Sequence, residues 1–81
     1  MKVAYSDAVI DALEDAPASV RKAFFKQTKI LEKNLRHPSL RAKKYDEAND
    51  LGQARVNRDW RFYFLIVDDT CRILKLIPHP K

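Results

Sequence analysis

The sequence contains a single glycine, Gly52, among its 81 residues. It therefore has no glycine-rich loop that could hold phosphates, which excludes the P-loop and dinucleotide-binding classes. The single cysteine, Cys71, cannot form a disulfide within the chain, and this fits a reducing compartment. Cys71 and the two histidines are also too scattered for a metal site, so we expect a protein without a metal or other cofactor.

Long apolar runs are absent as well. No stretch is long enough to span a membrane, and the first five residues lead into an acidic amphipathic segment rather than a signal peptide. We therefore expect a cytoplasmic protein. A chain of this length has room for one domain, residues 1–81, and its hydrophobic content of 46% is typical of a folded globular protein.

Charge is distributed unevenly along the chain. The net charge is +5, yet residues 1–20 are acidic. Their only lysine or arginine is Lys2, and their acidic residues are Asp7, Asp11, Glu14 and Asp15. The remainder is therefore more basic than the net charge alone indicates. Such a body favours a polyanionic partner, either nucleic acid or an acidic protein, although an ordinary solvated surface can carry the same charge.

The first half of the chain predicts a short strand and two helices. Lys2–Tyr5 is the expected strand, and the Ser6 hydroxyl can cap the helix that follows. The apolar face of that helix consists of Val9, Ala12, Leu13 and Ala16, which follow the i, i+3, i+4, i+7 spacing of a helix. Pro17 separates it from a second helix, expected over residues 18–35 and ended by His37-Pro38-Ser39.

The second half predicts strands. Residues 40–45 are expected to be extended and residues 46–52 to form a polar loop. Three short strands follow at residues 53–57, 61–67 and 71–78, and their two short connections predict an antiparallel meander.

The register of this meander can be argued from the side chains. Three-residue loops would set Val67 opposite Cys71 and Asn57 opposite Arg61, and directly opposed residues share a face. One face then receives an almost wholly apolar set: Ala54, Val56, Phe62, Phe64, Leu74 and Leu76, with Ile66 near its edge. The other receives a polar set: Arg55, Asn57, Arg61, Tyr63 and Lys75, and by extension Asp59 and His79.

Two-residue loops would place Lys75 in the core, so we prefer the three-residue register. The sequence thus predicts an α+β fold, in which an N-terminal short strand and a helical hairpin pack on one face of a twisted antiparallel sheet. The opposite face is expected to be open and basic.

The open face combines the residue types that cleave RNA without a metal. A base must remove the proton of a 2′-hydroxyl, cations must stabilise the phosphorane, and an acid must protonate the leaving 5′-oxygen. The arginine fork matches two phosphate oxygens, histidine titrates near neutral pH, and an aromatic ring can stack a base. No serine lies in a strained nucleophile turn, which excludes a Ser/His/Asp hydrolase.

Each of these residues also has a simpler interpretation. Any half-exposed sheet can carry the cations Arg55, Arg61 and Lys75, and a histidine near the end of the chain, such as His79, is often idle. Asp59 can stabilise a turn, Trp60 can fill a gap in the packing, and Tyr63 can be an ordinary strand aromatic.

One stretch of the chain resembles a known family. Ala54-Arg55-Val56-Asn57-Arg58-Asp59-Trp60-Arg61-Phe62-Tyr63-Phe64 looks like the central hairpin of the RelE/ParE superfamily, whose pattern is R-[VI]-[NG]-x-x-[WYF]-R followed by a hydrophobic residue. The segment from His37 to Tyr45 resembles the strand that precedes that hairpin, and Ile77-Pro78-His79-Pro80-Lys81 resembles the family's last strand. The resemblance covers essentially the whole chain.

The resemblance implies the toxin of a type II toxin–antitoxin system. RelE-like members cleave mRNA on the ribosome and stop translation, whereas ParE-like members inhibit DNA gyrase, and in both cases a cognate antitoxin protein silences the toxin. The implied partners are thus mRNA, the ribosome and an antitoxin that covers either the apolar rim or the basic face. A metal-independent endoribonuclease is the first hypothesis.

The resemblance also implies roles for individual residues. Arg61 falls on the arginine that contacts the scissile phosphate, Arg55 on a basic position of the preceding strand, and His79 on a C-terminal acid or base. Asp59 is expected to act as base or to orient a partner. RNA-binding positions are expected at Lys43, Lys44, Arg58, Trp60, Tyr63 and Lys75.

Two alternatives remain open. A gyrase-binding toxin acts by binding and needs no acid–base pair, so His79 and the Asp59-Trp60 pair favour the nuclease. Many active members place an aromatic residue after the C-terminal histidine, whereas this chain has Pro80 and Lys81 there. That departure is the feature expected of a module that only binds its antitoxin.

Overall fold

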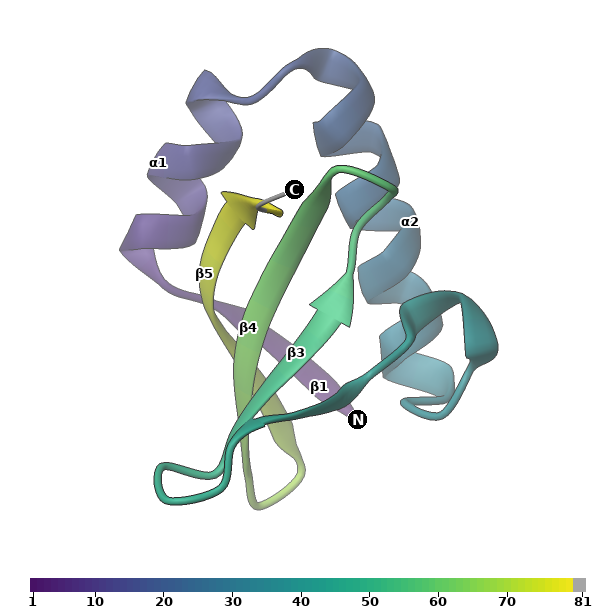
Figure 1. Ribbon diagram of the computed structural model, residues 1–81, viewed down its shortest axis with the longest axis vertical. Helices are drawn as coiled ribbons and strands as arrows, with labels where there is room; N and C mark the ends of the chain where they lie inside the picture. Colours follow the sequence, from purple (N-terminus) through teal and green to yellow (C-terminus); the bar gives the residue numbers. More distant parts are fainter. Residues whose placement is uncertain (80–81) are drawn as a thin grey trace.

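The computed structural model describes residues 1–79, and the Pro80-Lys81 end of the C-terminal motif lies outside the described residues. The elements follow the expected order of strand, helices and strands (Figure 1). They are β1 (Lys2–Tyr5), α1 (Asp7–Asp15), α2 (Ala18–Lys33), a 3-10 turn η1 (Pro38–Leu40), β2 (Lys43–Asp46), β3 (Leu51–Arg55), β4 (Trp60–Val67) and β5 (Thr70–Pro78). The predicted α+β fold is confirmed.

Ser6 fixes the junction between β1 and α1. Its Oγ accepts a hydrogen bond from the Val9 backbone N–H at 3.2 Å, as a helix cap should, and donates one to the Leu74 carbonyl at 3.0 Å. One side chain therefore begins α1 and attaches it to β5. The second helix ends at Lys33, two residues before the predicted boundary, and its last carbonyls are met by the Asn34 N–H, which donates to Ile30 O.

The five strands form one sheet in the order β1-β5-β4-β3-β2. β2 to β5 are antiparallel, as predicted, whereas β1 joins β5 in parallel. A parallel neighbour needs a long crossover connection, and here the intervening chain supplies both helices. In Figure 1, α1 lies beside β5 and α2 beside β3.

The predicted β4–β5 register holds over only half of the pair. Arg61 pairs with Ile77 and Tyr63 with Lys75, as a three-residue loop requires. Beyond that point a bulge shifts the pairing by one, so that Phe64 meets Ile73 and the loop shortens to Asp68-Asp69. The prediction of a three-residue loop at this turn was therefore wrong. At the other turn Arg61 pairs with Arg55 rather than Asn57, a shift of two that keeps every side chain on its predicted face.

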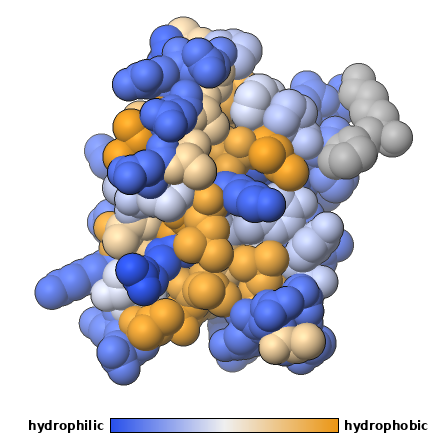
Figure 2. Space-filling view, turned by 90° about the vertical axis from the view of Figure 1, so that its left-hand side faces the viewer, coloured by the Kyte–Doolittle hydropathy of each residue, from blue (hydrophilic) through white to orange (hydrophobic). Residues whose placement is uncertain are grey.

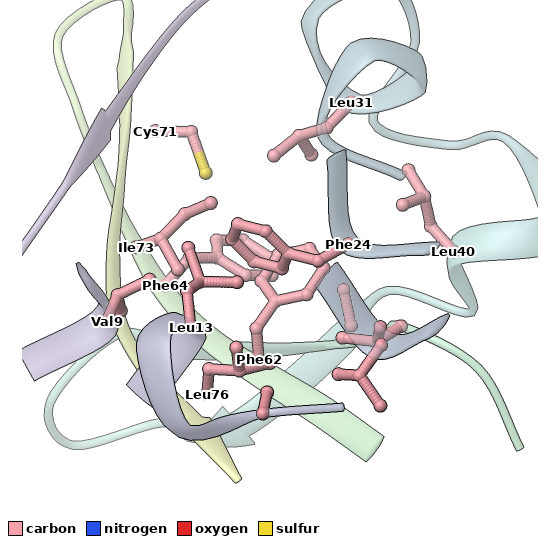
Figure 3. Packing of buried hydrophobic residues seen from close by; sticks show 14 residues of the cluster. Val9, Leu13, Phe24, Leu31, Leu40, Phe62, Phe64, Cys71, Ile73 and Leu76 are labelled. Carbon is pink, nitrogen blue, oxygen red and sulfur yellow. The ribbon is translucent and has the colours of Figure 1, made fainter. Parts of the chain in front are cut away.

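The core lies between the helices and one face of the sheet (Figure 3). Phe24 of α2 and Phe62 of β4 are fully buried and meet edge to face, with ring centroids 5.7 Å apart. Burial of each such side chain stabilises the fold by roughly 1.5–3 kcal/mol. The placement of Leu74 in the core was wrong, because the bulge turns it to the opposite face, and Cys71 and Ile73 are buried in its place.

No helix within residues 1–79 combines the length and the apolar character needed to cross a membrane.

Gly52 is required by packing. Its partner across the strands is Phe64, whose ring covers the glycine so closely that an added Cβ would lie 2.5 Å from Phe64 Cζ. We expect Gly52→Ala to lower the free energy of unfolding by about 1–3 kcal/mol, because the buried ring has to shift. Urea denaturation measures this, with Ala48→Ser in an exposed turn as the control. Equal midpoints for the two variants would contradict the prediction.

Cys71 should be inert in the folded protein. The thiol is fully buried, and burial raises its pKa to about 11. Because the thiolate is the reactive form, an aromatic disulfide reagent at pH 8 should label the native protein far more slowly than the urea-unfolded protein. Because the folded protein disfavours the thiolate, the free energy of unfolding should fall as the pH rises from the ordinary thiol pKa of 9.0 to about 11. Rapid labelling without denaturant would contradict this placement.

Candidate functional site

The open face of the sheet carries basic residues in transverse rows. Arg55, Arg61 and Ile77 are paired across β3, β4 and β5, and so are Gln53, Tyr63 and Lys75. Since directly opposed residues share a face, these rows lie on the side away from the core. Lys43 of β2 extends the second row through its pairing with Gln53. The expected residues Arg55, Arg61, Tyr63 and Lys75 therefore share one surface.

Arg61 lies at the centre of this surface. Its Nη1 donates to the carbonyls of Asn57 at 2.6 Å and Trp60 at 2.9 Å, which fixes the guanidinium against the β3–β4 turn. Partial burial lowers the pKa of Arg61, and the charges of Arg55 and Arg41 lower it further. An arginine in this state remains charged at neutral pH, so the site concentrates positive charge and favours an anion.

The β3–β4 turn brings the two candidate proton-transfer groups together. Asn57 Oδ1 accepts the backbone N–H groups of Asp59 and Trp60, at 2.9 and 3.0 Å, and shapes the turn. The His79 N–H then donates to the Asp59 carbonyl at 2.6 Å. Asp59 and His79 are thus backbone neighbours, both exposed, in the row beyond Arg61.

Three expected RNA-binding residues lie elsewhere. Trp60 alternates with Arg61 and shares the face of Phe62, where it packs against the core, so the structure favours its packing role. Lys44 pairs with Gly52, which places it on the helix side of the sheet, and it forms an ion pair with Asp50. Arg58 is exposed in the β3–β4 turn.

Arg41 lies close enough for its charge to lower the pKa of Arg61, although the sequence did not indicate it. It follows η1 in a left-handed backbone conformation, with φ of 46°, a conformation that is uncommon for residues other than glycine. Buried Gln27 ties this loop to the sheet, because its Nε2 donates to Ser39 O at 3.0 Å and to Arg55 O at 2.8 Å. The amide of one α2 residue thus holds the loop that carries Arg41 against the strand that carries Arg55.

The helix side has a different character. Tyr5, Ile10 and Phe25 are exposed and, with Leu13, line a hollow of about 500 Å³ between α1 and α2. Figure 2, viewed from the left-hand side of Figure 1 where α1 lies, shows apolar side chains gathered along the middle of the molecule between hydrophilic flanks. An exposed apolar surface of this kind marks a protein interface. Among residues 1–79, no three His, Cys, Asp or Glu side chains are grouped to hold a metal ion.

No protein-family model and no curated protein matches the sequence, but solved structures match the fold. A chain of the archaeal RelE–RelB complex from Pyrococcus horikoshii has a TM-score of 0.80 and 27% identity, over 95% of this chain and 92% of that one. The YoeB dimer from Staphylococcus aureus has a TM-score of 0.79 and 13% identity, over 99% of this chain and 98% of that one. The isolated RelE toxin from E. coli has a TM-score of 0.77 and 11% identity, over 99% and 85%.

The clustering of Arg41, Arg55 and Arg61 can be tested with an anion. Removing one of three like charges should stabilise the unliganded protein slightly, by about 0.5 kcal/mol, while weakening anion binding. We expect Arg41→Gln to raise the melting temperature in low-salt buffer without phosphate and to reduce the increase that inorganic phosphate causes. Lys22→Gln, which removes an exposed cation of α2 on the other side of the sheet, should leave the phosphate effect unchanged. An unaltered phosphate effect in Arg41→Gln would exclude Arg41 from the site.

Proposed function

We propose that the chain is a member of the RelE/ParE superfamily, the toxin of a type II toxin–antitoxin pair, and that it acts as an endoribonuclease on mRNA. The observation that carries the proposal is the arrangement around Arg61. The charges of Arg55 and Arg41 act on Arg61, and Asp59 and His79, both exposed, are backbone neighbours in the next row. Phosphate binding and proton transfer are thereby available on one open surface.

The reaction that this surface supports is transesterification. Asp59 or His79 removes the proton of a 2′-hydroxyl, and the 2′-oxygen forms a bond to the adjacent phosphorus. The phosphorus–O5′ bond breaks, and the other member of the pair protonates the leaving oxygen. The products are a 2′,3′-cyclic phosphate and a 5′-hydroxyl, so atoms and protons balance without a cofactor.

The arginines stabilise the negative charge that develops on the phosphorane. The phosphorane carries more negative charge than the phosphodiester, and a preorganised guanidinium stabilises it more than it stabilises the substrate. Arg61 is preorganised by its two bonds to backbone carbonyls, and Arg55 and Arg41 add charge beside it. Lys43, Tyr63 and Lys75 extend the surface along which the RNA chain runs, and the site is open enough to receive mRNA presented by the ribosome.

A cognate antitoxin is the proposed protein partner. Among the similar structures are toxin–antitoxin complexes, RelE–RelB from Pyrococcus horikoshii and YoeB–YefM from Staphylococcus aureus. In this chain the uncovered aromatic side chains of the α1–α2 hollow support such a partner, because Tyr5 and Phe25 expose apolar area to water when the protein is alone. Action on mRNA places the protein in the cytoplasm.

The test is a reconstituted translation reaction with purified protein, in which mRNA 5′ ends are mapped. We expect discrete cuts that weaken by about 10²–10³-fold in Arg61→Ala, because a positioned donor to the transition state is lost. His79→Ala should weaken them by about 10²–10⁴-fold, the usual contribution of one acid–base group. Lys22→Ala, which removes an exposed cation of α2 away from the site, should cut like the unchanged protein.

The same reaction without ribosomes shows whether they are required. Absence of cuts in every condition, with translation unaffected, would overturn the nuclease proposal. Inhibition of DNA gyrase by the purified protein would then identify the ParE-like alternative, and its absence would leave the antitoxin-binding module.

A further inference from the structure

A second, smaller hollow lies on the open face next to the arginine cluster. It measures about 170 Å³ and is lined by Tyr45, Leu51, Tyr63, Leu74, Lys75 and Ile77. Two of these residues, Tyr63 and Lys75, form the row adjacent to that of Arg61. Rows on one face repeat every two residues, so the hollow begins roughly 7 Å along the strands from the row of Arg61.

Two β-bulges build the walls of this hollow. Tyr45 is the extra residue of β2, inserted between Lys44 and Asp46, which pair with consecutive residues of β3. Leu74 is the extra residue of β5, inserted between Ile73 and Lys75, which pair with consecutive residues of β4. A bulge redirects a side chain that regular pairing would place on the other face. The bulge in β5 thus leaves Leu74 on the open face, whereas Tyr45 lies on that face by its alternation with Lys43, and the bulge beside it sets Asp46 opposite Leu51.

The two tyrosines, Tyr63 and Tyr45, differ in burial and in how firmly the ring is held. Tyr63 is buried, and its hydroxyl accepts a hydrogen bond from Gln53 Nε2 at 3.0 Å, which holds the ring in place. Tyr45 rests edge-on against it, with ring centroids 4.8 Å apart and an angle of 68° between the planes, yet 60% of Tyr45 remains exposed. A fixed ring thus supports a second ring whose own surface is available for stacking.

We propose that this hollow binds a nucleobase of single-stranded RNA, that of a nucleotide next to the scissile phosphate. The inference rests on the proposed function and names a subsite of the same surface. The base stacks on Tyr45 and contacts Leu74 and Ile77, while Lys75 at the edge binds the phosphate of that nucleotide. An aromatic platform beside cations is the usual means of holding single-stranded nucleic acid, and none of the lining residues is acidic.

An apolar side chain of a protein partner would also fit a hollow of this size. The positive charges of the open face favour RNA, because a partner segment that extended from the hollow would cross Lys75, Arg61 and Arg55. A polyanionic chain satisfies those cations along its whole length. A peptide would do so only where it carries carboxylates.

The test is binding of a short fluorescent single-stranded RNA with 2′-O-methyl groups, which cannot be cleaved. A matched RNA lacks one base beside the central linkage. Tyr45→Ala should weaken binding of the complete RNA by about tenfold and leave binding of the abasic RNA unchanged, because only the stacking contact is lost. Tyr45→Phe keeps the ring and should bind like the unchanged protein. Phe25→Ala, which removes another exposed aromatic side chain, from α2, is the control.

The outcomes separate this inference from the proposed function. Binding of the complete RNA that depends on Arg61 but not on Tyr45 would overturn the base subsite and leave the nuclease proposal standing. Loss of binding to both RNAs in Tyr45→Ala, with an unchanged melting temperature, would also overturn it, because the residue would then bind backbone. Tyr45-dependent binding by a protein that fails to cut mRNA would support the subsite and overturn the nuclease. A Tyr45→Ala variant that binds RNA normally but loses a coexpressed antitoxin would assign the hollow to that partner.

Discussion

The pairing of β4 with β5 is the constraint on which the rest of this structure depends. Asp68, with φ of 55°, begins a two-residue turn that sets Val67 opposite Thr70. If that register continued unbroken, Lys75 would face the helices, and burial of an unpaired ammonium group costs several kcal/mol. The bulge at Leu74 absorbs one residue and prevents this. Cys71 and Ile73 face the core on one side of the bulge, and Leu76 faces it on the other.

The same bulge also creates the chemical side of the sheet. The pairing shifts by one residue between Tyr63 and Phe64. As a result, Arg61, Tyr63 and Lys75 lie together on the open face. The displaced residue, Leu74, adds an apolar wall to that face. The bulge that keeps Lys75 out of the core thus also shapes the surface on which we propose that RNA binds. This double role matters in a chain of 81 residues, because so small a core could hardly support a separate site.

The arginine cluster is held together by the backbone rather than by opposite charges. Arg61 donates to two carbonyls of its own turn, and Gln27 binds carbonyls of both the Arg41 loop and β3. These neutral contacts fix the position of the Arg61 guanidinium, whose pKa is lowered first by burial and then by the charges of Arg55 and Arg41. Like charges held close in this way repel in the free protein. A bound phosphate removes that repulsion, so the same arrangement that weakens the fold strengthens anion binding.

Sequence patterns predicted the elements that obey a regular period. Ser6 caps α1 as expected, and Arg55, Arg61, Tyr63 and Lys75 lie on the predicted face, because alternation along a strand can be followed in the sequence. Two of the residues that were missed depend on irregular backbone. Arg41 itself has a left-handed conformation after η1, and Leu74 is the extra residue of a bulge, and neither feature has a period. Tyr45 shares the face of Lys43 by ordinary alternation, but no motif singled it out. Trp60 was assigned to RNA by its motif, although its alternation with Arg61 already placed it with Phe62 on the core side.

Two of the uncovered surfaces of residues 1–79 lie on opposite sides of the sheet. The apolar hollow between α1 and α2 is on the helix side, next to the edge strand β1, and the cations are on the open side. A partner that neutralises the cations alone leaves Tyr5 and Phe25 exposed to water, and one that covers those rings alone leaves the arginines free. An antitoxin that does both has to extend around an edge of the sheet, with apolar residues for one surface and carboxylates for the other. Length and charge pattern, rather than a compact complementary shape, are therefore the properties that we expect of the proposed antitoxin.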